Sequence, residues 1–294
     1  MNVRVAPGKY VLAVSGGVDS MVLLDVLRQL PGVELTVAHF DHGIRPDSKK
    51  DREFVGCAAR AHNLPYIYES GNLGAAASEA TARDARYAFL RRVQKEQGAQ
   101  AIITAHHQDD ALETAILNLL RGTGRKGLSA LQSRPDVLRP MLHVTKQEIL
   151  AYARAHNLPW REDSTNADAR YLRNYIRHAI VPQLGNAGRQ ELLKTIERTE
   201  AANAYIDAAL ALLLPGKGEP FDRYVFIMLP HALARETMAA WLRQNQALGF
   251  DRKAIERLVV FAKTALPGKV ADIDGHRLLT AGKSTLKITP RHLS

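Results

Sequence analysis

Short runs of apolar, often β-branched residues recur along the first half of the chain and alternate with longer stretches of helical spacing. Runs of this length are typical of buried strands, and apolar positions three and four residues apart are typical of helices. The predicted strands are 10–15, 34–40, 66–70, 101–106 and 137–141, and the predicted helices are 20–30, 49–63, 79–98 and 110–122. This alternation predicts an α/β fold with a doubly wound parallel sheet, whose ligands sit at the carboxyl ends of the strands.

The second half of the chain carries a different pattern. Thr145 and Glu148 have the spacing of a capping box, which predicts that a helix begins there. A long helical pattern at 189–214 ends at a Pro-Gly pair and is expected to form a linker helix. Later segments predict helices at 231–246 and 251–263 and strands at 269–274, 277–282 and 286–290. The predicted organisation is an α/β domain at 1–186, a linker helix at 187–216 and a small α+β C-terminal domain at 217–294.

Cysteine content and hydropathy exclude several classes of protein. The 294 residues include a single cysteine, Cys57, which forms no intrachain disulfide and no CxxC redox or thiolate metal site within this chain. Cys57 itself is expected to be a packed residue. A run of about 18 apolar residues, enough to cross a membrane, occurs nowhere, and the first residues lack the pattern of a signal peptide. We therefore expect a cytoplasmic protein with no membrane partner.

The net charge of +10 is unevenly distributed. Counting Lys and Arg against Asp and Glu gives −1 for residues 1–120, +6 for 121–186, −1 for 187–214 and +6 for 215–294. Two basic segments in an otherwise neutral chain indicate a surface for a polyanion that is separate from the small-molecule site. The alternative is that this charge serves solubility alone.

A glycine-containing segment marks the point where the first predicted strand passes into its helix. Its residues are Ser15, Gly16, Gly17, Val18, Asp19 and Ser20. Two glycines allow a tight turn that brings N–H groups toward phosphate oxygens, and the helix N-terminus adds a favourable dipole. A pyrophosphate fits such a loop, although a glycine turn with a helix cap is the structural alternative. Asp19 is unfavourable beside phosphate unless a metal intervenes, so we predict that Asp19 binds a Mg²⁺ ion bridging it to the nucleotide.

This segment resembles the signature of the N-type ATP pyrophosphatase superfamily, whose members split ATP into AMP and pyrophosphate. The resemblance implies a PP-loop fold of the adenine nucleotide alpha hydrolase type, with the six residues binding ATP and with ATP and Mg²⁺ as cofactors. Members include GMP synthetase, NAD synthetase, asparagine synthetase, tRNA thiolases and tRNA(Ile)-lysidine synthases.

Segments 39–45 and 104–114, which follow the second and fourth predicted strands, resemble the lysidine synthases. In the second segment, His106, Asp110 and Glu113 share one helical face if the helix extends back to His106. Such a face can bind Mg²⁺, orient an amine or accept its proton, and these three are the candidate catalytic residues. The alternative is helix capping by Asp109 with solvated charges around it. Helical phase alone favours Asp110 over Asp109 as the catalytic carboxylate.

Further motifs resemble lysidine synthases in the same order along the chain, and together the matches cover about residues 10–185. They are 83–87, 121–124, 139–140, 162–166 and 173–177. Arginines in them can pair with tRNA phosphates or with charge on ATP. The expected tRNA or substrate contacts are Asp41, His42, Arg83, Arg86, Arg173 and Arg177. The length and the basic tail are similar to the short form of the enzyme, which has one small C-terminal domain. The resemblance implies that 1–186 is the PP-loop ATP pyrophosphatase catalytic domain and that 217–294 binds tRNA.

The resemblance implies a substrate, the wobble cytidine of the isoleucine tRNA with a CAU anticodon. The C2 carbonyl oxygen would attack the α-phosphate of ATP, and the ε-amine of free L-lysine would then displace AMP. Because the lysine ε-ammonium has a pKa of about 10.4, a carboxylate such as Asp110 or Glu113 is needed to take its proton. The oligomeric state is left open, a homodimer included.

Three other interpretations remain open from the sequence. A tRNA thiolase would use the same adenylation followed by sulfur transfer, but such enzymes generally need catalytic or cluster-binding cysteines, and only Cys57 is present. A GMP or NAD synthetase would leave the basic tail unexplained. A nucleotide-dependent RNA-binding protein without turnover would make the acidic groups near Asp110 structural.

Overall fold

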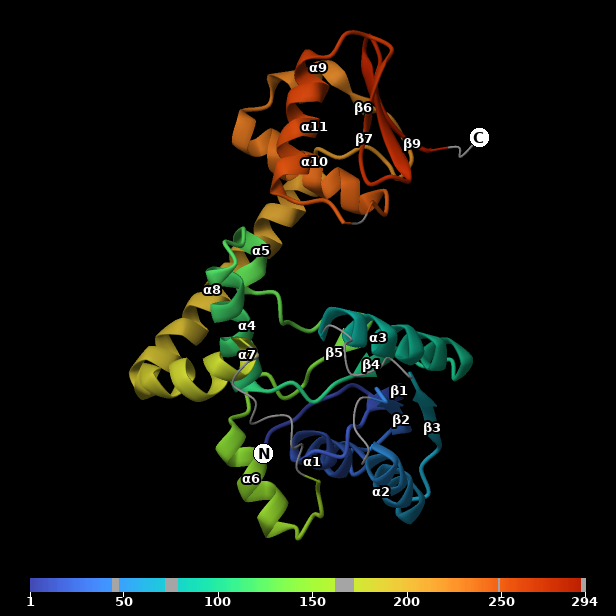
Figure 1. Cartoon of the computed structure of the whole chain (residues 1–294), viewed down its shortest axis with the longest axis vertical. Helices are drawn as coiled ribbons and strands as arrows, with labels where there is room; N and C mark the ends of the chain where they lie inside the picture. The colour runs from blue at the N-terminus through green and yellow to red at the C-terminus, as the bar shows by residue number, and fades with distance from the viewer. Residues whose placement is uncertain (44–47, 72–78, 162–171, 248, 292–294) are drawn as a thin grey trace. The chain divides into compact units, whose positions relative to one another are not determined.

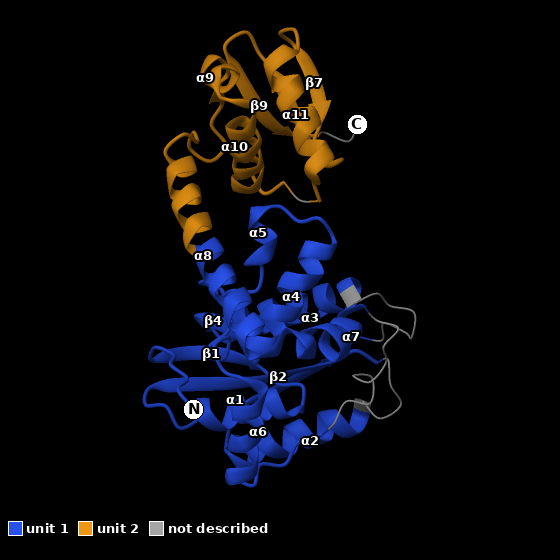
Figure 2. Cartoon of the chain, turned by 90° about the vertical axis from the view of Figure 1, so that its left-hand side faces the viewer, with its two compact units in different colours: residues 1–200 blue, residues 201–294 orange. Residues whose placement is uncertain are grey.

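The structure, a computed structural model, describes residues 1–43, 48–71, 79–161, 172–247 and 249–291. Its contacts divide the chain into two compact units, Met1–Glu200 and Ala201–Ser294 (Figure 2). The division falls within one long helix, α8 (Gly185–Ala211). The three-part organisation with boundaries at 186 and 216 stays a prediction.

The first unit is built on a five-stranded sheet in which every pair of neighbouring strands is parallel (Figure 1). The strands are β1 (Gly8–Ala13), β2 (Val33–Asp41), β3 (Tyr66–Ser70), β4 (Ala101–Ile103) and β5 (Val137–Leu138). Their order is β3-β2-β1-β4-β5. The predicted doubly wound α/β fold is therefore confirmed, with all five predicted strands present.

Helices cover both faces of this sheet. The helices packed on it are α1 (Val18–Leu27), α2 (Ser48–Ala61), α3 (Glu79–Glu96) and α6 (Lys146–Ala155), while α4 (Gln108–Leu120) and α5 (Arg125–Leu128) follow β4. Alternate residues of β1 belong to different cores, because successive side chains of a strand point to opposite faces. Leu12 packs in the core that includes α1, α2 and α6, whereas Val11 packs with Phe89 and Val93 of α3. This two-sided burial explains why the strand sequences are apolar throughout.

The strand order places a topological switch point between β1 and β4. From β1 the chain adds β2 and β3 on one side, then returns to add β4 and β5 on the other. The connections that leave β1 and β4 therefore diverge, and a crevice opens between them at the carboxyl ends of the strands. The glycine loop follows β1 and His106 follows β4, so both lie at this crevice.

A third cluster of buried residues joins α4 to the segment that begins at Leu172. That segment contains α7 (Leu172–Tyr175), a π-helical turn (Ile176–Ile180) and a 3₁₀ turn (Val181–Leu184), and it leads directly into α8. Leu112 of α4 packs with Ile176 and Val181. This packing brings Arg173 and Arg177 against α4, about 60 residues away in sequence from their partners.

The second unit has its own antiparallel sheet and its own core. Its strands are β6 (Phe221–Asp222), β7 (Lys269–Asp272), β8 (Arg277–Ala281) and β9 (Thr285–Pro290), in the order β6-β9-β8-β7. Its helices are α9 (Arg223–Met228), α10 (His231–Gln244) and α11 (Arg252–Thr264). Trp241 is fully buried at the centre, and Arg223 is buried with its guanidinium donating to the carbonyls of Ala262 and Gly282. A small α+β unit at this end of the chain is thus confirmed.

Some local predictions were wrong. The fourth strand ends at Ile103 rather than at residue 106, because the chain turns there to begin α4. Cys57 is exposed rather than packed, since it lies on the solvent side of α2, where its sulfur accepts a hydrogen bond from Arg60.

The capping box of α6 is confirmed, with Glu148 N–H donating to Thr145 Oγ1 and Thr145 N–H donating to Glu148 Oε2. In the described part of the chain, no helix is long and apolar enough to cross a membrane.

Candidate nucleotide site and its neighbours

The glycine loop is held in a fixed shape by Ser20. The Ser20 hydroxyl donates to the carbonyl of Gly17 at 2.9 Å and accepts from the N–H groups of Ser15 and Gly16 at 3.2 and 3.3 Å. Gly16 has a φ of +94°, in the region that only glycine adopts without strain. Gly16 and Ser20 are therefore needed for the turn itself.

The first turn of α1 is left open by this arrangement. Its N-cap is Gly17, and no side chain caps the helix. The first N–H groups of a helix have no intrahelical partner, and with the helix dipole they favour an anion. The loop and α1 together therefore present a surface suited to phosphate at the switch point of the sheet.

Asp19, in this first turn, is paired with a lysine distant in sequence. The Nζ atom of Lys146 lies 2.6 Å from Asp19 Oδ1. Lys146 is the first residue of α6, whose position is fixed by its capping box and by packing of α6 against α1. Sequence reasoning missed Lys146. Lys146 follows the fifth predicted strand, and residues at that edge of the sheet bind ligands, so its position could have indicated a role.

Among the described residues, no group of three or more His, Cys, Asp or Glu side chains is arranged to hold a metal ion. A lone carboxylate nevertheless fits Mg²⁺, which proteins hold through one or two carboxylates together with substrate phosphates. Asp19 supplies such a carboxylate beside the open helix N-terminus. Its pairing with Lys146 shows that this position favours a cation.

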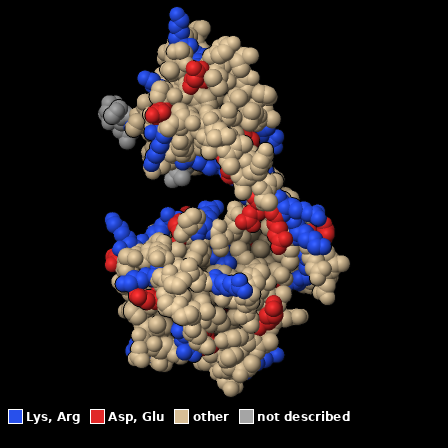
Figure 3. Space-filling model, turned by 180° about the vertical axis from the view of Figure 1, so that it is seen from behind, with Lys and Arg blue, Asp and Glu red and all other residues tan. Residues whose placement is uncertain are grey.

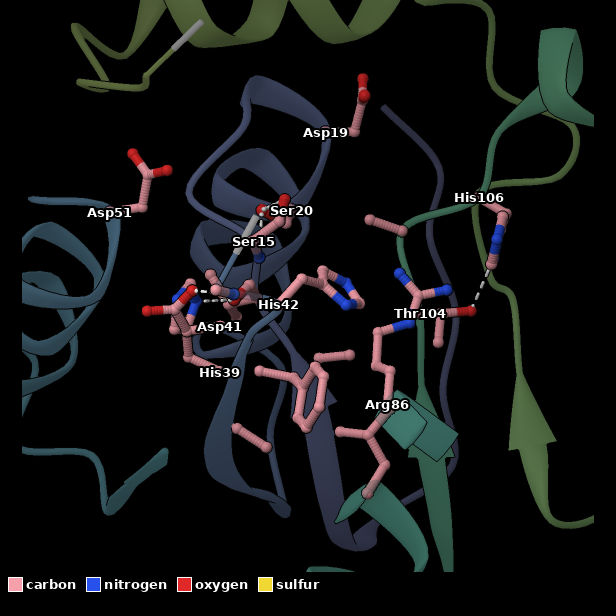
Figure 4. Close-up of a pocket in the computed structure, with 17 residues that line it drawn as sticks. Ser15, Asp19, Ser20, His39, Asp41, His42, Asp51, Arg86, Thr104 and His106 are labelled. Carbon is pink, nitrogen blue, oxygen red and sulfur yellow. Dashed lines mark hydrogen bonds between the residues drawn. The ribbon is translucent and has the colours of Figure 1, made fainter. Parts of the chain in front are cut away.

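A cavity of about 370 Å³ lies beside the loop, within the size range of small-molecule sites (Figure 4). Its walls combine apolar side chains with polar groups from the ends of β1, β2 and β4. Asp41, His42 and Arg86 line it, together with Asp19 and His106. The structure thus brings together predicted site residues from four separate elements.

Three of the predicted contacts, Arg83, Arg173 and Arg177, lie outside the lining of this cavity. Arg83 packs over the Tyr87 ring, with its guanidinium carbon 5.0 Å from the ring centroid, and Arg86 lies over the same ring at 5.6 Å. Arg139 donates to the Tyr87 hydroxyl at 3.4 Å, and burial lowers the pKa of its guanidinium. The arginines around Tyr87 form a strongly cationic wall next to the cavity, as expected of a site for anions.

Arg173 and Arg177 lie against α4, where they hold a buried carboxylate. Glu113 is 1% exposed, and its two oxygens accept from Arg177 at 2.6 and 2.9 Å and from Arg173 at 3.2 Å. The same arginines lie 3.9 and 3.5 Å from Asp110 Oδ1. The predicted contacts and the predicted catalytic carboxylates therefore form one charged cluster. Whether these residues act in catalysis stays a prediction.

The predicted helical face of His106, Asp110 and Glu113 does not include His106 in the structure. The helix begins at Gln108, so His106 precedes it and shares a hydrogen bond of 2.8 Å with the Thr104 hydroxyl. His107 is the N-cap: its ring accepts from the Asp109 N–H, while Asp110 accepts from the His107 N–H at 2.9 Å. Capping is therefore performed by His107 and Asp110, and not by Asp109. Asp109 instead pairs with Arg189 of α8.

The titration of this region is set by burial and by neighbouring charge. Burial lowers the pKa of His106, an effect that Asp110 opposes and Arg139 reinforces, so the imidazole is neutral at pH 7. Burial raises the pKa of Asp110, but His107, His106 and Arg173 outweigh it and hold that pKa below its ordinary value. The cluster therefore contains an ionised Asp110 beside a neutral His106.

One predicted motif, 162–166, and residues Ile44 and Arg45 lie outside the described residues. Arg161, just before that motif, donates its N–H to the carbonyl of Gly16 at 3.0 Å, and its side chain pairs with Asp51, which lines the cavity. Arg161 thus contacts the glycine loop directly.

His39, at the end of β2, makes stability sensitive to acid. Burial lowers its pKa, whereas in the unfolded chain the ring takes a proton below about pH 6.5. The unfolded state then binds more protons than the folded state, so the free energy of unfolding is expected to fall as the pH drops from 7 to 5, by up to about 2 kcal/mol from this group. In His39→Asn the free energy of unfolding should depend less steeply on pH. Urea unfolding at several pH values measures this dependence. His62→Asn, on the exposed surface, serves as the control, and equal slopes for both variants would refute the assignment.

Lysine and arginine side chains are spread over the surfaces of both units, as Figure 3 shows for one face of each. The segments 121–186 and 215–294, each with a net charge of +6, belong to different units. A net positive charge thus occurs in both units.

The sequence matches a family model described as a PP-loop domain over residues 2–184. It is 43% identical to a tRNA(Ile)-lysidine synthase of Thermotoga maritima, over 65% of this chain and 47% of that protein. It is 37% identical to that of a strain of Thermus thermophilus, over 98% and 58%, and 36% identical to that of Solibacter usitatus, over 88% and 64%. The chain thus spans about half to two thirds of the length of these relatives.

Among solved structures, the chain is similar to the U34-tRNA thiolase NcsA from Methanococcus maripaludis with its [4Fe-4S] cluster. The TM-score is 0.55 and the sequence identity 16%, over 66% of this chain and 73% of that one. At this identity the likeness concerns the fold alone. The parallel sheet, the glycine loop at its switch point and the match over residues 2–184 agree, and the chain belongs to the PP-loop family of ATP-using proteins.

Proposed function

We propose that the protein is a tRNA(Ile)-lysidine synthase, which joins free L-lysine to C2 of the wobble cytidine of tRNA(Ile) with a CAU anticodon. One observation carries the proposal most directly. Asp110, Glu113, Arg173 and Arg177 form a charged cluster next to the PP-loop, since His107 Nε2 lies 3.6 Å from Asp110 Oδ2 and 3.8 Å from Asp19 Oδ1. The names of the curated relatives support the same activity.

In the first proposed step, ATP lies in the cavity of about 370 Å³ with its pyrophosphate against Gly16, Gly17 and the open first turn of α1. Mg²⁺ would be held by Asp19 and would neutralise charge on the phosphates. The C2 carbonyl oxygen of cytosine attacks the α-phosphate, and pyrophosphate leaves. Arg86, which lines the cavity, stabilises the negative charge that develops.

In the second step, the neutral ε-amine of lysine attacks C2, and AMP leaves with the C2 oxygen. The amine loses a proton as the new C–N bond forms, and a carboxylate must receive it. Asp110 is the better placed acceptor, because both oxygens of Glu113 already accept hydrogen bonds from Arg173 and Arg177. We therefore assign proton acceptance to Asp110 and the positioning of Arg173 and Arg177 to Glu113.

For this chemistry the cytosine must leave the anticodon stack, as bases of single-stranded RNA loops do when proteins recognise them. The basic surface would hold the tRNA by phosphate contacts, which makes binding strongly dependent on salt. We expect the protein to act in the cytoplasm. A homodimer stays a prediction.

The decisive test incubates the protein with ATP, Mg²⁺ and radiolabelled lysine, together with either CAU-anticodon tRNA(Ile) or elongator tRNA(Met). Acid-insoluble label in tRNA(Ile) alone is the expected result. Release of AMP without incorporated label would support the adenylation step, but a nucleophile other than lysine would then have to be sought. No AMP release with RNA present would leave an RNA-binding protein without turnover. The role assignments fail if Asp110→Asn and Glu113→Gln both keep wild-type single-turnover rates.

A further inference from the structure

Both backbone polar groups of Gly16, in the glycine loop, are hydrogen-bonded. The Gly16 N–H donates to Ser20 Oγ at 3.3 Å, and the Gly16 carbonyl accepts from the Arg161 N–H at 3.0 Å. Because a trans peptide points its carbonyl and its N–H in opposite directions, the Gly17 N–H faces away from Arg161. The Gly17 nitrogen lies 3.3 Å from Ser15 Oγ, and Ser15 lines the cavity of about 370 Å³. This donor is therefore on the cavity side of the loop.

The side chain of Arg161 is anchored as well. Its guanidinium pairs with the carboxylate of Asp51, in the first turn of α2. The two side chains are 35% and 12% exposed, so water screens the pair only in part. Asp51 lines the cavity, and Figure 4 shows it beside α2. The backbone of Arg161, which holds the loop, is thus tied to a helix of the first unit.

The same helix packs against the loop. A Cβ atom placed on Gly16 would lie 3.4 Å from Val55 Cγ2 and 3.5 Å from Phe54 Cδ1, so α2 lies close to this glycine. Val55 is about one turn after Asp51 on α2, and it is fully buried. Arg161 therefore closes a unit of three parts, because its backbone binds the loop and its side chain binds the helix on which the loop rests.

The ion pair also sets the charge of the cavity. A carboxylate at a phosphate site repels the ligand unless a cation neutralises it. Lys146 supplies the cation for Asp19, and Arg161 supplies it for Asp51. Loss of the Arg161 guanidinium would leave the Asp51 carboxylate at the cavity without this counter-charge.

We propose that Arg161 is a positioning residue for pyrophosphate binding, and this inference rests on the nucleotide site of the proposed function. The Arg161 N–H fixes the orientation of the Gly16–Gly17 peptide, so that the Gly17 N–H donates to a phosphate oxygen. Asp51 holds Arg161 in place, and Arg161 in turn neutralises Asp51. Neither side chain takes part in making or breaking bonds.

The test measures binding of Mg²⁺-pyrophosphate and of adenosine to the full chain by calorimetry. Arg161→Met should weaken pyrophosphate binding by about 10-fold, the effect of losing one hydrogen bond to a charged group. Adenosine, which has no phosphate, should bind within about twofold of its wild-type affinity. Arg161→Lys keeps a cation for Asp51 and should bind pyrophosphate within about threefold of wild type. Arg154→Met, on the exposed surface of α6, is the matched control, and Arg161→Gln replaces Arg161→Met if the latter fails to fold.

Amide hydrogen exchange tests the backbone contact without any ligand. The amide of residue 161 should be protected in the wild type and should lose protection in Arg161→Met, while the amides of α1 stay protected. Unchanged protection of that amide in Arg161→Met would show that the ion pair does not hold the contact with Gly16.

A double-mutant cycle tests the pairing of the two side chains. In Arg161→Met, adding Asp51→Asn should recover part of the lost affinity for pyrophosphate, because it removes the carboxylate that has lost its counter-charge. In the wild type, Asp51→Asn should give no gain, since it also releases Arg161. Equal effects of Asp51→Asn in both backgrounds would overturn the pairing. Glu53→Gln, an exposed carboxylate on α2, is the control for the change of charge.

The binding data also separate this inference from the proposed function. If the wild type binds pyrophosphate and Arg161→Met binds it equally well, the nucleotide site stands and the role of Arg161 is wrong. If the wild type binds neither pyrophosphate nor ATP, the proposed function fails as well. Equal weakening of pyrophosphate and adenosine would show a general loss of the site, and it would also overturn the assignment.

Discussion

Replacing Asp19 with asparagine is expected to lower the rate of pyrophosphate release by about 100- to 1000-fold, the usual cost of removing one group that stabilises the transition state. Asparagine keeps the size of the side chain and one acceptor oxygen but loses the charge. Asp19 is the acidic residue of the PP-loop, and its Oδ1 atom already attracts a cation, Lys146, at 2.6 Å. The measurement is pyrophosphate release with saturating ATP, Mg²⁺ and tRNA.

The control for this prediction is Asp136→Asn, which removes the same charge from a half-exposed carboxylate paired with Arg91 on the surface. It should leave the rate within about twofold, since exposed ion pairs contribute little. Asp19→Asn should also require more Mg²⁺ for half-maximal rate. A normal rate with a normal Mg²⁺ requirement would show that Asp19 does not hold the metal.

Hydrophobic pattern predicted the architecture well, because a doubly wound sheet buries whole strands and its helices expose one face. The end of β4 was harder to predict. Thr104 and Ala105 continue the apolar run, but the pattern does not show where pairing stops and the N-cap of α4 begins. The exposed Cys57 was mispredicted for a related reason: average burial of a residue type says nothing about which side of a helix it occupies.

The sequence located the glycine loop and the segments at the carboxyl ends of the strands, because those positions follow from the fold class. It did not reveal which charges pair. Lys146 is 127 residues from Asp19, and Arg177 is 64 residues from Glu113. These pairs depend on how α6 and the π-helical turn pack, which no local spacing encodes. Asp110 lies near Arg177 and Asp109 pairs with Arg189, so the two carboxylates face different partners, and which of them is catalytic stays a prediction.

Replacing Glu113 with glutamine is expected to lower the free energy of unfolding of the first unit by about 3 kcal/mol, because it removes one partner of a buried ion pair. Glu113 is 1% exposed, and both of its oxygens accept from guanidinium groups. The Asp110 carboxylate, 3.9 and 3.5 Å from Arg173 and Arg177, is too distant to replace those hydrogen bonds. Urea unfolding, together with amide hydrogen exchange in α4, measures the loss.

A double-mutant cycle tests the physical reason for that loss. If the cost comes from an arginine that has lost its carboxylate partner, Arg177→Met should recover part of it, and the double variant should be more stable than the sum of the single changes predicts. Glu191→Gln, which removes an exposed carboxylate 3.9 Å from Arg198, should cost less than about 0.5 kcal/mol. Strict additivity of Glu113→Gln and Arg177→Met would mean that the two residues do not stabilise each other. Glu113 would then be free to take the amine proton, and the assignment of that role to Asp110 would lose its structural argument.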